Sequence, residues 1–525
     1  MRCALTFVLA AVFVVAQQPG AKLKPPPAAV AAGFESISVE DCKTWLAFLA
    51  GPECEGRGTG QDGYQKAADY VAERFREFGL KPVGDKGQDG KPSYFQMVPF
   101  TATGIDPTTC SLEVVGKTKT TVPLGEGFGV SGSGAVECDA PAVFLAASAT
   151  SREEPEVDVE GKAVILLAYG DDGGFPPEIR FLNKLRGRKP AAILRINNVS
   201  AARGAASAGG WSRVDPKRPP RDDGEGGGRR GATPSTFISE EVLRKLAEAG
   251  GVDVEKLVAD ARRDGGPKTK AAPLRIKLKA KSKRLFRDVP NVVGYLEGSD
   301  PKLKKEVVIF GSHLDHLGRR DDGAIFFGAD DDGSGSTGLI AIARAFTKNA
   351  RAPKRSVLFL AVCGEEIGLL GSDWYVEHPI FPIEDTVAEL QMDMIGRREE
   401  AHDRENPGNE KAEDNVNTLH VVGSTKISTQ LHEIILKANA DHIGFDFEYD
   451  GEKYYTRSDH YNFARKGIPV AFVFTGVHRD YHEVSDTPDK IDYPKLARVA
   501  QLMYLVGFEV ADRAERLVKD VKSRK

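Results

Sequence analysis

An apolar, β-branched run at residues 307–310 constrains this chain most, because it is followed by a glycine, a serine and then His313, Asp315 and His316. Such a run is typical of a buried strand, whose carboxyl end would here carry imidazole and carboxylate groups. Three consecutive aspartates, residues 330–332, come shortly afterwards and open into a turn of small residues. Adjacent carboxylates repel one another unless a cation neutralises them. The stretch therefore predicts a metal site at a strand end, with a solvated acidic turn as the alternative.

Three later apolar runs also end in side chains that can bind a metal. The runs 356–363, 389–392 and 470–475 lead to Glu365 with Glu366, to Asp393 and to His482, respectively. In open α/β sheets, ligand-binding groups gather at the carboxyl ends of the strands, so we expect these side chains to meet His313 and Asp331. Two imidazoles and three carboxylates, with one glutamate to spare, suit two metal ions that share a bridging carboxylate, an arrangement that serves hydrolysis.

The types of ligand narrow the choice of metal. Imidazole and carboxylate together are ligands of zinc and its neighbours, whereas calcium takes oxygen only. An EF-hand loop is excluded, because the three aspartates are contiguous and no glutamate closes a twelve-residue loop.

The order of these motifs resembles that of the dizinc aminopeptidases of the bacterial leucyl aminopeptidase type, a family of zinc-dependent exopeptidases. The motifs are H-L-D (313–315), G-A-D-D-D-G-S-G (328–335), G-E-E-x-G-L-x-G-S (364–372), M-D-M-I-G (392–396), S-D-H-Y-N-F (458–463) and D-Y-H-x-x-x-D-T-P (480–488). With the segment E-G-R-G-T-G at 55–60, the resemblance covers nearly all of the chain after its N-terminal leader. It implies an α/β fold, a zinc-exopeptidase sandwich with a central mixed β-sheet flanked by helices.

The resemblance also implies a role for each side chain of the site. Asp331 would bridge two zinc ions, Glu365 would be the general base, and Asp315 would orient His313. The remaining ligands would be His313 and Asp393 for one zinc, and Glu366 and His482 for the other. The stretch around Tyr455 and Arg457 would lie beside the substrate, where either residue could contact it or serve only in packing or at the surface.

Composition divides the chain into five segments. Residues 1–16 predict a cleavable signal peptide and hence a secreted or periplasmic protein, with an uncleaved anchor as the alternative. A Pro/Ala-rich linker at 17–37 precedes the N-terminal part of the catalytic domain at 38–104, and this domain resumes at 288–520. The insert at 105–287 alternates short β-like runs with glycine and charge, and part of it resembles a protease-associated domain.

Charge and cysteine content bear on the partners. The net charge of −4 argues against a nucleic-acid partner and against a strongly anionic membrane. We expect peptide substrates, no nucleic acid, and no stable membrane insertion after signal removal. Cys42 with Cys54, and Cys110 with Cys138, could form disulfides in an oxidising compartment or remain free thiols.

Three functions compete at this point. The resemblance favours a secreted aminopeptidase that uses two zinc ions. A carboxypeptidase, or a glutaminyl cyclase working with one metal, would share the fold and differ in the pocket. A catalytically inactive binding module is the third possibility, against which the complete set of ligand-type residues argues.

Overall fold

The protein is described here from a computed structural model that covers residues 23–125, 127–131, 136–150, 157–170, 181–196, 211–214, 235–320, 323–402 and 405–521. The predicted signal peptide, residues 1–16, lies outside these ranges. Within them, no helix combines the length and the apolar character needed to cross a membrane. The five cysteines of this part of the chain are free thiols.

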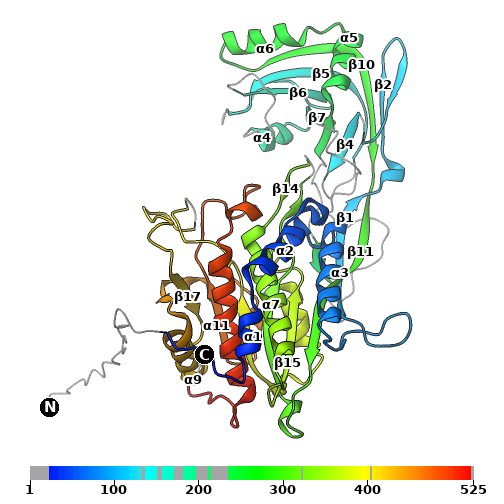
Figure 1. Cartoon of the computed structure of the whole chain (residues 1–525). Helices are drawn as coiled ribbons and strands as arrows, with labels where there is room; N and C mark the ends of the chain where they lie inside the picture. Colours follow the sequence, from blue (N-terminus) through cyan, green and yellow to red (C-terminus); the bar gives the residue numbers. More distant parts are fainter. Residues whose placement is uncertain are drawn as a thin grey trace, which may run out of the picture.

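The predicted site is carried by a mixed sheet that, within the described ranges, has nine strands in the order β18-β17-β19-β16-β12-β15-β11-β1-β8 (Figure 1). Its four central strands are parallel to one another: β19 (Val470–Phe474), β16 (Thr386–Met392), β12 (Val307–His313) and β15 (Ser356–Val362). Every residue of these four strands is buried, which explains why they appear in the sequence as continuous apolar runs. Because the strands are parallel, their carboxyl ends lie at one edge of the sheet.

Helices cover both faces of this sheet. On one face, α1 (Ala31–Ser36), α2 (Val39–Leu49), α3 (Asp62–Glu77), α7 (Gly335–Lys348), α9 (Thr429–Ala438) and α11 (Tyr493–Asp512) share a core with Phe310 and Phe359. On the other face, α8 (Leu370–Glu377) and α10 (His460–Arg465) pack against Ile309 and Leu358. The central mixed sheet flanked by helices confirms the fold class that the sequence predicted.

Several of these helices begin at side-chain caps. The side chains of Ser38, Ser428 and Asp492 accept hydrogen bonds from main-chain N–H groups in the first turns of α2, α9 and α11. Helix α1 begins at Ala31, inside the segment 17–37 that we predicted as a linker, and it packs against α7 and α11. The helical layer therefore starts earlier than residue 38.

A second sheet extends from one end of the first (Figure 1). In the described part of the chain its strand order is β3-β2-β10-β5-β6-β7-β9-β4. These strands are β2 (Ser111–Val115), β3 (Lys119–Val122), β4 (Phe128–Ser131), β5 (Val136–Ser148), β6 (Ala163–Tyr169), β7 (Ala192–Ile196), β9 (Ser235–Ile238) and β10 (Lys268–Ala280). With α4 (Leu182–Gly187), α5 (Glu240–Gly250) and α6 (Val254–Arg263), they enclose apolar cores of their own.

Two long strands join the two sheets. β1 (Phe95–Ile105) leads into the second sheet and β11 (Ser282–Leu296) returns from it, and they pair antiparallel from Phe95↔Val292 to Ile105↔Ser282. All strands of the second sheet lie inside the segment 105–287 that we predicted as an insert. One strand from that segment, β8 (Trp211–Arg213), instead pairs with β1 at the edge of the first sheet. The remaining strands are β13 (Gly318–Arg319), β14 (Ile325–Phe326), β17 (Thr418–Val422) and β18 (Asp446–Glu448).

Candidate metal centre

The structure brings the predicted ligand-type residues together at the carboxyl edge of the parallel strands. His313 is the last residue of β12, and Asp393 follows β16 directly. Glu365 lies three residues after the end of β15, and His482 lies in the loop after β19. With Asp331, which lies in the turn before α7, these four residues line one pocket.

The three consecutive aspartates are buried, with 0%, 3% and 0% of Asp330, Asp331 and Asp332 exposed, which excludes the solvated acidic turn. Asp330 pairs with His478, at 3.1 Å, and accepts a hydrogen bond from the main-chain N–H of Gly396. The carboxylates of Asp330 and Asp332 both accept hydrogen bonds from main-chain N–H groups and so stabilise the turn. Of the three, Asp331 has its carboxylate within 3.2 Å of two imidazoles of the predicted site, whereas an oxygen of Asp332 lies within 4.8 Å of the His313 ring and of Asp393.

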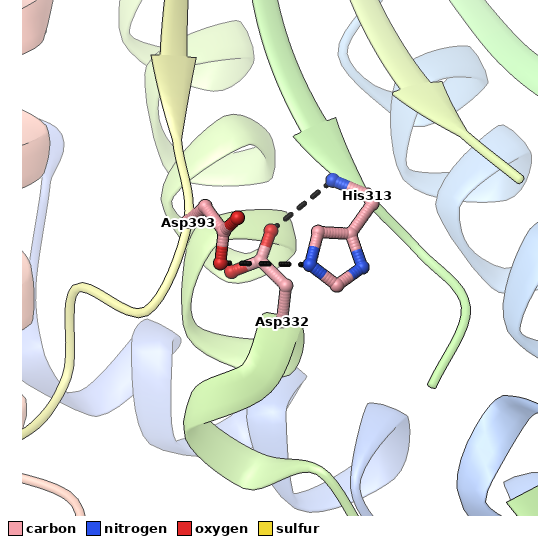
Figure 2. A group of neighbouring side chains, drawn as sticks. All are labelled: His313, Asp332 and Asp393. Atoms are coloured by element: carbon pink, nitrogen blue, oxygen red, sulfur yellow. Dashed lines mark hydrogen bonds and ion pairs between the residues drawn. The ribbon is translucent and has the colours of Figure 1, made fainter. Parts of the chain in front are cut away.

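Asp332 holds three elements together through main-chain contacts. Its Oδ2 accepts a hydrogen bond from the N–H of His313 (3.1 Å), and its Oδ1 accepts bonds from the N–H groups of Gly335 (2.8 Å) and Met394 (3.1 Å). Figure 2 shows this carboxylate directed at the main chain of His313, while Asp393 faces the imidazole ring. The end of β12, the start of α7 and the loop after β16 are therefore fixed relative to one another.

The two carboxylate oxygens of Asp331 face different partners. Oδ1 lies 3.2 Å from Nε2 of His313, whereas Oδ2 lies 3.0 Å from Nε2 of His482. Nε2 of His313 also lies 3.5 Å from Oδ1 of Asp393, and Nε2 of His482 lies 3.1 Å from Oε2 of Glu366. Asp331 thus stands between two imidazole–carboxylate pairs.

Asp315 connects Glu365 to the N-terminal segment. Its Oδ1 accepts a hydrogen bond from the main-chain N–H of Glu365 (3.1 Å), and its Oδ2 accepts one from the hydroxyl of Thr59 (2.7 Å). Its carboxylate lies 4.0 Å from Nδ1 of His313, while the main-chain carbonyl of Asp315 lies only 3.0 Å from that atom. The nearer contact to the imidazole is therefore made by the carbonyl of Asp315, and orientation of His313 by the carboxylate stays a prediction.

A fully buried arginine ties the same N-terminal segment to the site. The guanidinium of Arg57 donates hydrogen bonds to the main-chain carbonyls of Leu49 (2.7 Å), Leu314 (2.8 Å), Phe327 (2.9 Å) and Gly328 (2.7 Å). These bonds hold the loop that precedes the aspartates against the chain after β12. The sequence motif E-G-R-G-T-G indicated this segment but not this role.

The structure separates the two residues that we placed beside the substrate. Arg457 lines the pocket and donates a hydrogen bond to the hydroxyl of Tyr481 at 3.3 Å. Tyr455 does not line it, because its ring packs against His460 and Gly423. This position fits the packing role that the sequence left open for Tyr455. The other wall residues, which sequence reasoning missed, are Met394, Tyr454, Phe472, Phe474, Val477 and Tyr481.

Some of these wall residues could have been predicted. Phe472 and Phe474 alternate along the last residues of β19, so both point to the same face of the sheet. Tyr481 is adjacent to His482 in the D-Y-H motif.

Burial and neighbouring charge shift the acidity of the site. Burial raises the pKa of the Glu365 carboxyl well above its usual range, and it raises the pKa of Asp315 to about 6. Burial also opposes ionisation of Asp331, but the facing imidazoles of His316, His313 and His482 hold its pKa well below the usual range. A divalent cation in the site would favour the charged form of each carboxyl group.

The residues present fit such a cation. In the described part of the chain, no lysine or arginine forms an ion pair with Asp331, Glu366 or Asp393. Both ring nitrogens of the buried His316, and Oε1 of Glu366, have no hydrogen-bond partner among the described residues. Buried polar atoms without a partner are costly, and a metal ion would satisfy them.

The segment that carries this site matches a known family. Residues 291–506 match the model of Peptidase family M28, and this range includes the four central strands and all of the predicted metal ligands. This match agrees with the resemblance to zinc-dependent exopeptidases that the order of the motifs indicated.

Individual relatives match over part of their length. The probable leucine aminopeptidase 2 of Aspergillus oryzae is 31% identical over 238 residues, 45% of this chain and 38% of the relative. The probable leucine aminopeptidase of Arthroderma otae is 27% identical over 221 residues, 40% of this chain and 56% of the relative. The chain thus spans about two fifths to just over half of the length of these relatives. The solved structure of a zinc aminopeptidase from Bacillus subtilis, BSAP, is 17% identical with a TM-score of 0.48 and covers 93% of this chain and 99% of that one.

Proposed function

We propose that this chain is a zinc-dependent aminopeptidase that removes N-terminal residues from peptides. The observation that carries the proposal is the position of Asp331, whose two oxygens face the pairs His313–Asp393 and His482–Glu366. One carboxylate shared between two imidazole–carboxylate pairs is the arrangement that two metal ions need. The match of this segment to a peptidase family supports the assignment.

Two zinc ions would be held by residues on both sides of Asp331. The ligands would be Asp331, His313 and Asp393 for one ion, and Asp331, Glu366 and His482 for the other. When bound, the zinc ions polarise the scissile carbonyl group and lower the pKa of water in the site toward neutrality.

Glu365 would move the proton. Its carboxyl group lines the pocket, and it belongs to no ion pair among the described residues, so it is free to act on a water molecule. Glu365 accepts the proton of the attacking water and returns it to the departing amine. The hydrogen bond between its main-chain N–H and Asp315 fixes where the side chain starts.

The residues of the pocket wall would influence whether the N-terminal or the C-terminal end of a peptide binds there. Met394, Phe472, Phe474 and Val477 form an apolar surface beside the ligands, which would suit an apolar side chain of the substrate. Arg457 adds a cation to the same wall, paired with Glu405. Because a cation suits a peptide carboxylate, Arg457 favours carboxypeptidase activity as the second candidate.

Two further parts of the proposal concern the rest of the chain. The leader at residues 1–16 would direct export, so the working site would be secreted or periplasmic. The second sheet would be an inserted domain that shapes access to the site.

A matched set of peptides tests the proposed polarity. The zinc-loaded protein would be assayed on one peptide in four forms: free, N-acetylated, C-terminally amidated, and blocked at both ends. We expect the free and amidated forms to be cleaved at similar rates from the N-terminus, and the acetylated forms to be resistant. Loss of cleavage on amidation, with acetylation tolerated, would indicate a carboxypeptidase. No turnover of any form by protein with bound zinc would indicate a binding module.

A further inference from the structure

His316 is a second imidazole at the end of β12 that the proposed ligand set does not use. Its side chain is completely buried, and its Nδ1 lies 2.6 Å from Oε1 of Glu366 and 3.6 Å from Oδ2 of Asp331. Its ring also packs edge-on against that of His482, with 5.8 Å between the ring centres. His316 therefore stands beside all three of the proposed ligands of the second zinc ion.

The approach of His316 to Glu366 is short but is not a hydrogen bond. Within the described ranges, neither ring nitrogen of His316 nor Oε1 of Glu366 is in a hydrogen bond of acceptable geometry. Atoms that bind one tetrahedral zinc ion at about 2.0 Å are roughly 3.3 Å apart. Nδ1 of His316 lies 2.6 Å from Glu366 and 3.6 Å from Asp331, and Nε2 of His482 lies 3.0 Å from Asp331 and 3.1 Å from Glu366. These four separations bracket that value.

Packing sets the position of this ring. The main-chain N–H of His316 donates a hydrogen bond to the carbonyl of Arg57 at 3.2 Å. On the other side lies Gly328, where an added Cβ would be only 2.5 Å from Cγ of His316, and whose φ of +58° also disfavours a side chain. The ring is therefore held between two segments and directed at Glu366.

We propose that His316 is a fourth protein ligand of the second zinc ion, together with Asp331, Glu366 and His482. The proposal rests on the metal centre of the proposed function and adds that its two zinc ions differ in their number of protein ligands. The first ion would have three protein ligands, because the oxygens of Asp332 are engaged by main-chain N–H groups.

The difference in ligand number has a chemical consequence. Zinc with four protein ligands resembles a structural site, whereas zinc with three keeps a position for water or substrate. The ion bound by His313 and Asp393 would therefore be the more open and more weakly held, and the ion bound by His316 the more tightly held.

Two substitutions separate a ligand from a residue that only orients Glu366. His316→Ala removes the ring. His316→Asn places an amide N–H near the former position of Nδ1, so it can still donate to Glu366 but is a poor zinc ligand. His432→Asn is the matched control, because His432 is a partly buried histidine on α9 that contacts Ser424 and Tyr449, away from the metal centre.

The measurement is the affinity of each bound zinc ion by competition with a coloured chelator, at fixed pH, on the full chain. Wild type and His432→Asn should release one zinc readily and one reluctantly. In both His316 variants the affinity for the more tightly bound zinc ion should fall by more than ~10–100-fold, which is the cost of losing a residue that only hydrogen-bonds to a ligand. The visible spectrum of the cobalt-loaded protein should change in intensity in both variants, because coordination number sets that intensity. Thermal melting of the metal-free proteins shows whether either variant is misfolded.

Each other outcome overturns the proposal. If His316→Asn keeps wild-type zinc affinity while His316→Ala loses it, His316 only orients Glu366. If both variants bind two ions as wild type does, His316 is no ligand and the metal centre of the proposed function still stands. If wild type binds no zinc, the proposed function and this proposal fail together.

Discussion

Replacing Glu365 by glutamine should lower turnover by roughly 10²–10⁴-fold while leaving the metal ions in place. The amide has nearly the same size and keeps the main-chain hydrogen bond to Asp315, which is 3.1 Å long. It cannot accept a proton, and loss of a general base costs on the order of 10²–10⁴ in rate, or about 3–5 kcal/mol of transition-state stabilisation. The Glu365 carboxyl is in no ion pair with the proposed ligands among the described residues, so zinc content should not change.

The neighbouring substitution, Glu366→Gln, should have the opposite pattern. Oε2 of Glu366 lies 3.1 Å from His482 and Oε1 lies 2.6 Å from His316, so glutamine would replace a charged ligand by a neutral one. Zinc affinity should fall, and turnover should fall with it but recover in part when excess zinc is supplied.

The assay for both variants is kcat/KM on a chromogenic amino-acid anilide, with zinc measured by elemental analysis of the same samples. The reasoning would be refuted if Glu365→Gln retained full turnover. If Glu365→Gln lost a zinc ion while Glu366→Gln kept both, the two glutamates would be assigned the wrong way round.

Three further predictions concern the fold and the leader. Arg57→Met removes the guanidinium that donates to four main-chain carbonyls, of which, among the described residues, only that of Gly328 keeps another donor, the N–H of Gly333. We expect the free energy of unfolding to fall by about 3–5 kcal/mol, and a loss under ~1 kcal/mol in urea titrations would contradict the role of Arg57. Burial lowers the pKa of Lys495 to about 8, so above that pH the unfolded chain binds more protons than the folded one. The free energy of unfolding should then rise by up to ~3 kcal/mol between pH 8 and 10.5, and Lys495→Met should remove that rise. If wild type and Lys495→Met showed the same dependence of unfolding free energy on pH, this prediction would be wrong. Terminal sequencing of exported protein should show residues 1–16 removed; an intact terminus would favour an anchor.

The sequence could predict the strands and their ends because each central strand is buried on both faces and is therefore apolar throughout. His313, Glu365 with Glu366, and Asp393 follow such strands closely, so their convergence depends only on the strands being parallel. The fold class and the resemblance to a peptidase family follow from the same pattern.

Other features depend on geometry that spacing does not contain. Asp331 and Asp332 are adjacent in the sequence, but their side chains point in different directions. The carboxylate of Asp331 faces two imidazoles, whereas that of Asp332 accepts hydrogen bonds from main-chain N–H groups. His316 comes three residues after the end of β12, and its orientation is set by contacts with Arg57 and Gly328 from distant parts of the chain. The pairing of strand β8 with β1 likewise joins parts of the chain that are far apart in sequence, so the spacing of residues does not predict it.

The most direct test of the account is the number of zinc ions bound to each chain. The purified full chain would be loaded with zinc, freed of excess by gel filtration, and measured by elemental analysis against protein concentration. A shared Asp331 between two imidazole–carboxylate pairs predicts close to two zinc ions per chain. A value of one or none after loading would contradict the two-metal centre.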